Sequence, residues 1–167
     1  MVIVVMGVSG SGKSSLAAAL AEAEGWDFQE GDELHPPANI DKMRAGSALT
    51  DADREPWLDR VADWIGDELR QQRDGVISCS ALRRRYRERL RQTGSNVRFV
   101  YIRVPRDELL RRLQQRDHFM PAALLDSQLH TLEEPVDECD VLTVTGEGGL
   151  QEILGACRTL LGRAAPH

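Results

Sequence analysis

A glycine-rich segment near the amino terminus has the residue types and the spacing that phosphate binding requires. Residues Gly7-Val8-Ser9-Gly10-Ser11-Gly12-Lys13-Ser14 match the pattern G-x-x-x-x-G-K-[ST] in full. Glycines let consecutive backbone N–H groups turn toward an anion, and the amino end of a following helix adds partial positive charge. Lys13 is expected to bridge the β- and γ-phosphates of a nucleotide, and the Ser14 hydroxyl to hold Mg²⁺. The loop therefore predicts binding of ATP and Mg²⁺.

Lysine is rare in this chain, which makes its presence in the loop more informative. Only Lys13 and Lys42 are lysines among the 21 basic residues. The predicted nucleotide-binding residues are Gly7, Val8, Ser9, Gly10, Ser11, Gly12, Lys13, Ser14 and Ser15. Of these, Ser9, Ser11 and Ser15 are small turn or helix residues to which we assign no individual role.

The elements around the loop alternate between strands and helices. Apolar runs predict strands over residues 1–6, 26–29, 76–79, 97–104 and 141–145. Helical periodicity predicts helices over 14–24, 56–72, 82–92 and 150–161, with others starting at Pro105 and after Pro121, and a short one from Pro36 to Gly46. This alternation predicts one α/β domain over residues 1–167: a P-loop NTPase fold with a five-stranded parallel sheet and helices on both faces. Ligands would bind beyond the carboxyl ends of the strands.

Composition argues against several partners. The net charge is −6 and aromatic residues are only 5%, so we expect no nucleic acid to bind. The longest purely apolar run, residues 2–6, is far too short to cross a membrane. Cys79, Cys139 and Cys157 are widely spaced and form no metal or redox pattern, so we expect a reduced, cytoplasmic compartment.

The acidic residues distinguish among classes of phosphate-loop protein. The guanine-reading N-K-x-D element of switch GTPases is absent, and the strand after Gly75 ends in Ser78-Cys79-Ser80, without the acid of motor ATPases. An acid follows the second strand instead. Asp32 is therefore predicted to orient or deprotonate an acceptor hydroxyl, directly or through Mg²⁺, the alternative being a solvated turn residue. Arg116 lies between two predicted helices, where a lid arginine would stabilise transition-state charge, the alternative being a surface arginine.

Several further segments, taken together, are far more specific than the loop alone. The segments are Gly31-Asp32-Glu33-Leu34-His35-Pro36, Asn39-Ile40-Asp41-Lys42-Met43, Leu49-Thr50-Asp51-Ala52-Asp53-Arg54-Glu55-Pro56-Trp57-Leu58, Cys79-Ser80-Ala81-Leu82, Tyr86-Arg87, His118-Phe119-Met120, Ser127-Gln128 and Leu132-Glu133-Glu134-Pro135. They run in order from the loop to about Asp140, and only the last strand and helix lack a distinctive match. Together they resemble the gluconokinase family of small P-loop kinases.

The resemblance implies transfer of the γ-phosphoryl group of ATP to the 6-hydroxyl of D-gluconate, giving 6-phospho-D-gluconate and ADP. It also implies a fold like those of shikimate and nucleoside monophosphate kinases, a mobile lid over about residues 116–134, and a homodimer. The family commonly has a lysine where this chain has Arg83. Because arginine and lysine differ in reach and hydrogen-bond geometry, this departure leaves the role of Arg83 open.

A gluconate site needs a cation for the carboxylate and polar groups for the hydroxyls. Arg54 is predicted to clamp the carboxylate with its planar fork, and His35 to bond a hydroxyl. The family pattern adds Ser80, Arg83 and Gln128 as substrate-binding residues. Lys42 either faces the substrate or pairs with a neighbouring acid, and the sequence does not decide between these.

Two other functions stay open at this point. One is a kinase for another small acid such as shikimate, although that family usually has D-x-D where this chain has Glu30-Gly31-Asp32. The other is a non-catalytic ATP-binding regulator that contacts RNA through an arginine-rich helix. Its arginines are Arg83, Arg84, Arg85, Arg87, Arg89 and Arg91. Because Leu82, Tyr86 and Leu90 form one apolar seam and the chain is acidic overall, we interpret the arginines as a solvated face.

Overall fold

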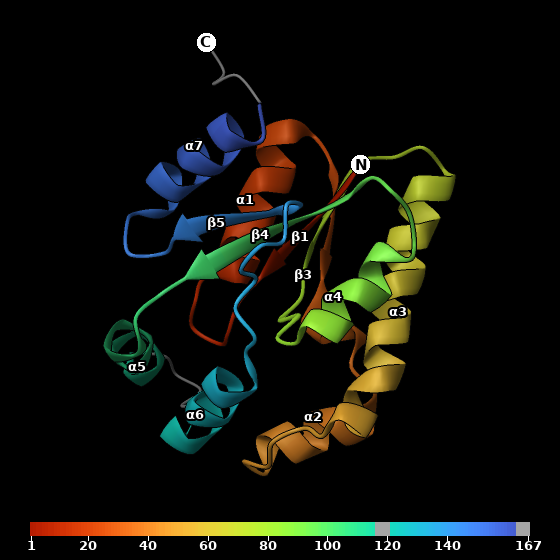
Figure 1. The fold of residues 1–167 in the computed structure, drawn as a ribbon. Coiled ribbons are helices and arrows are strands. Elements are labelled where there is room, and N and C mark those ends of the chain that lie inside the picture. Colours follow the sequence, from red (N-terminus) through yellow and green to blue (C-terminus); the bar gives the residue numbers. More distant parts are fainter. Residues whose placement is uncertain (116–120, 163–167) are drawn as a thin grey trace.

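The computed structural model describes residues 1–115 and 121–162 of the chain and contains one parallel sheet (Figure 1). Its strands are β1 (Val2–Met6), β2 (Asp27–Glu30), β3 (Gly75–Ser78), β4 (Val97–Arg103) and β5 (Val141–Thr145). They lie in the order β2-β3-β1-β4-β5, and every neighbouring pair is parallel. The five-stranded parallel sheet predicted from the sequence is confirmed.

Helices cover both faces of the sheet, as predicted. They are α1 (Lys13–Glu24), α2 (Pro37–Arg44), α3 (Asp51–Arg70), α4 (Arg84–Arg91), α5 (Arg106–Gln114), α6 (Ala122–Thr131) and α7 (Leu150–Leu160), with a 3₁₀ turn, η1, at Gly31–Leu34. In Figure 1, α1 and α7 lie on one side of the sheet and α3 and α4 on the other. The helices α2, α5 and α6 gather at the end of the sheet where the strands finish.

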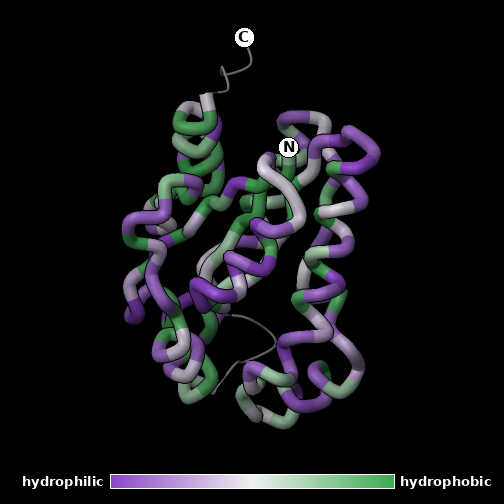
Figure 2. The backbone as a smooth tube through the Cα atoms, turned by 45° about the vertical axis from the view of Figure 1, so that its right-hand side comes forward, coloured by the Kyte–Doolittle hydropathy of each residue, from purple (hydrophilic) through white to green (hydrophobic). Residues whose placement is uncertain are grey.

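The apolar run of β1 supplies both hydrophobic cores because successive side chains point to opposite faces. Val2, Val4 and Met6 pack with α3 and α4. Ile3 and Val5 pack with α1 and α7. All five side chains are fully buried, and the central strands are mostly green in Figure 2, whereas the surrounding loops are mostly purple. A strand buried on both faces explains why its sequence does not alternate.

One helix begins earlier than its sequence predicts. We expected it to start at Pro56, but α3 starts at Asp51. The Thr50 hydroxyl accepts the Asp53 N–H at 3.1 Å, and the Asp53 carboxylate accepts the Thr50 N–H at 2.8 Å. This reciprocal capping box fixes the helix start and leaves Pro56 inside the helix. Arg54 therefore lies in the first turn of α3 rather than in a loop.

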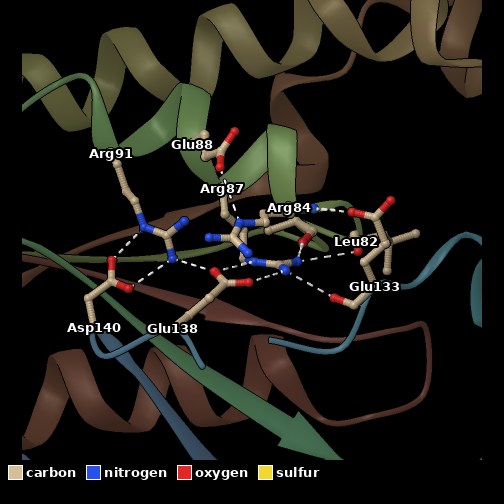
Figure 3. A network of polar contacts seen from close by, with 9 residues as sticks. Leu82, Arg84, Arg87, Glu88, Arg91, Glu133, Glu138 and Asp140 are labelled. Atoms are coloured by element: carbon tan, nitrogen blue, oxygen red, sulfur yellow. Dashed lines mark hydrogen bonds and ion pairs between the residues drawn. The ribbon is translucent and has the colours of Figure 1, made fainter. Parts of the chain in front are cut away.

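The interpretation of the arginine-rich helix as a solvated face is wrong for Arg87. Its side chain is fully buried, and Arg91 is only 24% exposed. Arg87 donates to Glu138 at 2.5 and 2.9 Å and to three backbone carbonyls, those of Ala81, Leu82 and Glu133, at 2.9 to 3.3 Å (Figure 3). Arg91 bridges Glu138 and Asp140. These two arginines tie α4 to the segment before β5 and present no charge to a partner.

Candidate active site

The phosphate loop connects β1 to the amino end of α1, as its sequence predicts. Gly12 has a φ of 92°, in the left-handed region that favours glycine. A Cβ placed on Gly12 would meet no atom of the described residues within 4 Å, so the loop faces open space at this residue. Lys13 opens α1, and its buried side chain lines a cavity beside the loop. This arrangement leaves room for an anion against the backbone N–H groups.

The cavity, of about 140 Å³, lies beyond the carboxyl ends of the strands and brings together most of the predicted site residues. They come from the phosphate loop, η1, α3, the segment after β3 and α6. The predicted residues that line it are Ser9, Lys13, Asp32, His35, Arg54, Ser80 and Gln128. Sequence reasoning assigned no role to several lining residues from α2, the α2–α3 connection and α6, although some of them lie in the segments that resemble the family. Among these are Met43, Ser47, Leu49, Leu124 and Ser127.

A rigid turn holds Asp32 at the edge of this cavity. The Glu30 carboxylate accepts the Asp32 N–H at 3.4 Å and the Ser78 hydroxyl, and the Ser78 oxygen accepts the Gly31 N–H at 3.0 Å. The Gly31 carbonyl accepts the Trp57 indole N–H at 2.8 Å. A Cβ on Gly31 would lie 1.9 Å from the Ser78 carbonyl oxygen, so only glycine fits there. The Asp32 carboxylate itself remains exposed and free to meet a ligand.

Arg54 is a buried cation without a carboxylate partner among the described residues. The residue is 8% exposed, and its side chain makes one hydrogen bond to the described residues, from Nη1 to the Tyr86 hydroxyl at 3.4 Å. Its guanidinium also lies 5.9 Å from the centre of the Tyr86 ring. A desolvated charge is costly unless an opposite charge meets it. An anion in the cavity would supply that charge.

Gln128 of α6 contacts the phosphate loop directly. Its Oε1 accepts the Ser9 N–H at 2.7 Å, and its Nε2 lies 3.1 Å from the Ser9 hydroxyl. The two bonds tie the helix between residues 122 and 131 to the loop. The sequence had assigned Ser9 no individual role, and this contact gives it one in the present arrangement.

The remaining predicted residues lie elsewhere. Arg83 does not line the cavity and pairs instead with Asp51 at 3.3 Å and Glu133 at 3.5 Å. Arg116 and the first part of the predicted lid lie outside the described residues. Lys42 bonds the Asp53 carboxylate at 2.6 Å, which settles the question that the sequence left open in favour of an acid partner.

A second cavity, also of about 140 Å³, adjoins the loop between α1 and the segment after β5. Ser11, Gly12 and Ser15 of the loop region contribute to its lining. Arg112 of α5 contributes as well, and its guanidinium donates to the carbonyls of Gly10 and Ser11 at 3.4 Å and to that of Gly146. No sequence motif marked Arg112 or Gly146. The carbonyls that Arg112 contacts are more than thirty residues away along the chain.

The donor groups of the site suit Mg²⁺. Within residues 1–115 and 121–162, no three His, Cys, Asp or Glu side chains converge on a point that could hold a metal ion. The described residues therefore do not form a metal site made of protein side chains alone. Mg²⁺ usually takes one or two protein oxygens and fills its remaining positions with water and phosphate oxygens. The half-buried Ser14 and the exposed Asp32 can supply such oxygens.

The fold and this site define a small P-loop kinase. The chain matches the AAA domain family over residues 2–135. It is 53% identical over 146 residues to a gluconokinase of Gluconobacter oxydans (strain 621H), covering 87% of this chain and 82% of that protein. The crystal structure of a gluconokinase from Sinorhizobium meliloti 1021 superposes with a TM-score of 0.87 at 47% identity, covering 96% and 90% of the two chains. The chain belongs to the gluconokinase family.

Similarity to shikimate kinases is limited to the fold. A shikimate kinase from Bacteroides thetaiotaomicron superposes with a TM-score of 0.71 but is only 18% identical, over 97% of this chain and 98% of that one. The shikimate alternative is therefore not favoured.

None of the helices in the described part of the chain is long and apolar enough to cross a membrane.

Proposed function

We propose that this kinase phosphorylates D-gluconate at the 6-hydroxyl with ATP, giving 6-phospho-D-gluconate and ADP. The observation that carries the substrate is Arg54, a buried guanidinium that lines the same cavity as Lys13 and Asp32 and has no carboxylate partner among the described residues. A sugar acid supplies the missing anion. The names of the similar gluconokinases from two organisms support the same substrate.

The cavity offers a group for each end of gluconate. Arg54 binds the carboxylate with its fork, and the 6-hydroxyl meets Asp32 at the other end. Ser80 and Gln128 line the same cavity and bond the intervening hydroxyls. Asp32 accepts the hydroxyl proton as the oxygen bonds to the γ-phosphorus and the bond from that phosphorus to the bridging oxygen of ADP breaks.

The phosphate loop and its neighbours hold the nucleotide in this proposal. Backbone N–H groups from Gly10 to Ser14 bind the phosphates, and Lys13 neutralises charge on the β- and γ-phosphates. The second cavity receives the base, because the planar Arg112 guanidinium is held in place by carbonyls and can stack on a purine. Arg116 is proposed to stabilise the transition-state charge.

Ser14 and Asp32 are the residues that would hold Mg²⁺ in this proposal. The ion, when bound, neutralises negative charge on the β- and γ-phosphates. We further propose a homodimer, a cytoplasmic location, and closure of a lid over residues 116–134. Family membership supports the dimer and the lid. Cys79, Cys139 and Cys157 are all free thiols, which supports a reduced compartment.

A coupled assay of ADP release tests the substrate. Wild-type enzyme is expected to prefer D-gluconate over D-glucose and D-gluconolactone by at least about 10² in kcat/KM, because sites built for a charged group reject analogues that lack it. Arg54→Ala should lose most activity on gluconate, and Arg54→Lys should recover only part, because an ammonium cannot reproduce the fork. Arg70→Ala, an exposed change on the same helix, is the control and should leave kcat/KM unchanged. Equal use of glucose and gluconate by the wild type would contradict the proposal.

A further inference from the structure

The His35 ring is held in one plane by its neighbours. The residue is only 6% exposed, and its ring stacks on Trp57 with 4.4 Å between centroids and 14° between planes. Trp57 is itself fixed, since it is 1% exposed and its indole N–H donates to the Gly31 carbonyl at 2.8 Å. The plane of the imidazole is therefore determined by the core of the protein, and only its orientation within that plane remains to be specified.

Asn39 specifies that orientation. This buried residue of α2 places its amide nitrogen 2.8 Å from the Asp53 carbonyl oxygen and 3.2 Å from Nδ1 of His35. A carbonyl oxygen only accepts hydrogen bonds, so the group that faces Asp53 must be the NH₂ of the amide. That same NH₂ faces His35, and it can only donate. Nδ1 of His35 must therefore accept, which means that it carries no proton.

The proton of the neutral ring then resides on Nε2, and Nε2 is available to a ligand. His35 lines the cavity that also contains Arg54 and Asp32. The one hydrogen bond between the His35 ring and the described residues is at Nδ1, and Nε2, which has no such bond, is not fully buried. An N–H group that is accessible in a cavity can donate to a ligand oxygen.

We infer that Asn39 is a positioning residue, which fixes His35 as a neutral hydrogen-bond donor aimed at an acceptor oxygen at the carboxylate end of the sugar acid. The substrate part of this inference rests on the proposed function. Arg54 has only donors, so Arg54 and His35 together present N–H groups to that end of the ligand. A carboxylate, which only accepts, matches such a pair, whereas a neutral aldehyde or ring oxygen leaves the guanidinium without an opposite charge.

The charges around the ring agree with a neutral histidine. Burial lowers the pKa of His35, the Asp32 carboxylate acts in the opposite direction, and the Arg54 guanidinium lowers it further. The net effect is a pKa below the ordinary value, so the ring is uncharged at neutral pH. A protonated ring would also point an N–H at the NH₂ of Asn39, which is unfavourable because neither group can accept.

NMR of the ring nitrogens tests the tautomer without any substrate. Long-range ¹H–¹⁵N spectra of the full chain at neutral pH are expected to show His35 with Nδ1 unprotonated and Nε2 protonated, the signal being assigned from its loss in His35→Gln. Asn39→Asp replaces the donor with an acceptor of the same shape, so Nδ1 should become protonated. Asn96→Asp makes the same chemical change at an exposed position and should leave the His35 signals unchanged. A wild-type spectrum with a protonated Nδ1 would overturn the inference. This outcome is measured on the wild-type protein, so it does not depend on whether a variant folds.

Kinetics test whether the donor is used. Asn39→Asp should raise KM for gluconate by about tenfold, the effect of one lost hydrogen bond to a charged oxygen, with kcat and KM for ATP within about twofold. An unchanged KM for gluconate, despite the altered tautomer, would refute the role in recognition. If gluconate is not phosphorylated at all, the proposed function fails, while the tautomer is still decided by the NMR spectra.

Discussion

Replacing Arg87 with leucine should destabilise the protein strongly, although Arg87 is one of six arginines in α4 and its N-cap, residues 83 to 91. Its guanidinium is fully buried and makes bonds to the Glu138 carboxylate and to three backbone carbonyls (Figure 3). Leucine fills part of the volume but donates no hydrogen bond. Arg87→Leu therefore leaves carbonyl oxygens unpaired in the interior and leaves Glu138 with Arg91 as its cation.

The size of the effect follows from these contacts. Removing one partner of a buried ion pair costs about 3–5 kcal/mol, and each buried carbonyl left unpaired costs about 1–3 kcal/mol, although such terms do not simply add. Because Glu138 keeps Arg91, we expect a loss of about 3–5 kcal/mol in the free energy of unfolding. That is a large part of the about 5–15 kcal/mol by which a domain is usually stable. It corresponds to a fall in Tm of about 6–20 °C.

Urea unfolding followed by circular dichroism measures this loss. Arg89→Leu is the matched control, since Arg89 lies on the same helix but pairs with Asp59 at 3.0 Å in an exposed position. Its effect should stay below about 1 kcal/mol. The double variant Arg87→Leu with Glu138→Leu should recover part of the loss, because it removes the incompletely paired charge. An Arg87→Leu protein within about 1 kcal/mol of wild type would refute the reasoning.

The same network predicts a dependence of stability on pH. Burial raises the pKa of Glu138, but hydrogen bonds from Arg87 and Arg91 outweigh burial and leave that pKa below its ordinary value. A carboxyl group with a depressed pKa in the folded state stabilises the protein above its unfolded pKa and loses this contribution as pH falls. Wild-type unfolding free energy should therefore decrease below about pH 4, and Glu138→Gln should show a smaller decrease. Parallel curves for the two proteins would contradict this assignment.

Three further variants test the site. Lys13→Ala should abolish turnover while circular dichroism shows an intact fold, and near-normal turnover would exclude Lys13 from phosphate binding. Asp32→Asn should lower kcat by about 10²–10⁴ with ATP binding still measurable by calorimetry, whereas a loss below about fivefold would make Asp32 a turn residue. Gln128→Ala should speed hydrogen exchange of the Ser9 amide by about fivefold or more, since it removes the acceptor of that N–H, and equal exchange would contradict the tie between α6 and the loop.

The sequence predicted best where a local pattern determines the structure. The phosphate loop and β1 follow from consecutive residues, and the sheet follows from alternating strands and helices. The predicted start of α3 was wrong. Pro56 suggested the first position of the helix, whereas the capping box of Thr50 and Asp53 starts the helix at Asp51. The residues of the capping box were present in the sequence, but the prediction gave more weight to Pro56.

Other features depend on residues distant in the chain and could not be predicted. The burial of Arg87 depends on Glu138, 51 residues away, and an arginine-rich helix by itself has the pattern of a solvated face. The cavity beside Arg112 forms because α5 reaches carbonyls more than 100 residues earlier. The residues of the first cavity were found because the family resemblance indicated them. Composition and periodicity alone would have suggested Lys13 and Asp32 but not Gln128.

The buried Trp57 side chain contacts both the turn that carries Asp32 and the His35 ring. Trp57 donates its indole N–H to the carbonyl of Gly31, directly before Asp32, and its ring stacks on His35. Arg54 lies one helical turn earlier on the same helix, α3. The first turns of α3 therefore help to position all three proposed groups. These are Asp32, which would accept the hydroxyl proton, and Arg54 and His35, which would donate to the carboxylate. The start of α3 is in turn fixed by its capping box. The relative placement of Arg54, His35 and Asp32 is then set by the folded core. We therefore expect a linear sugar acid to be selected by its length as well as by its charge, because a shorter acid bound at Arg54 would not bring its terminal hydroxyl to Asp32.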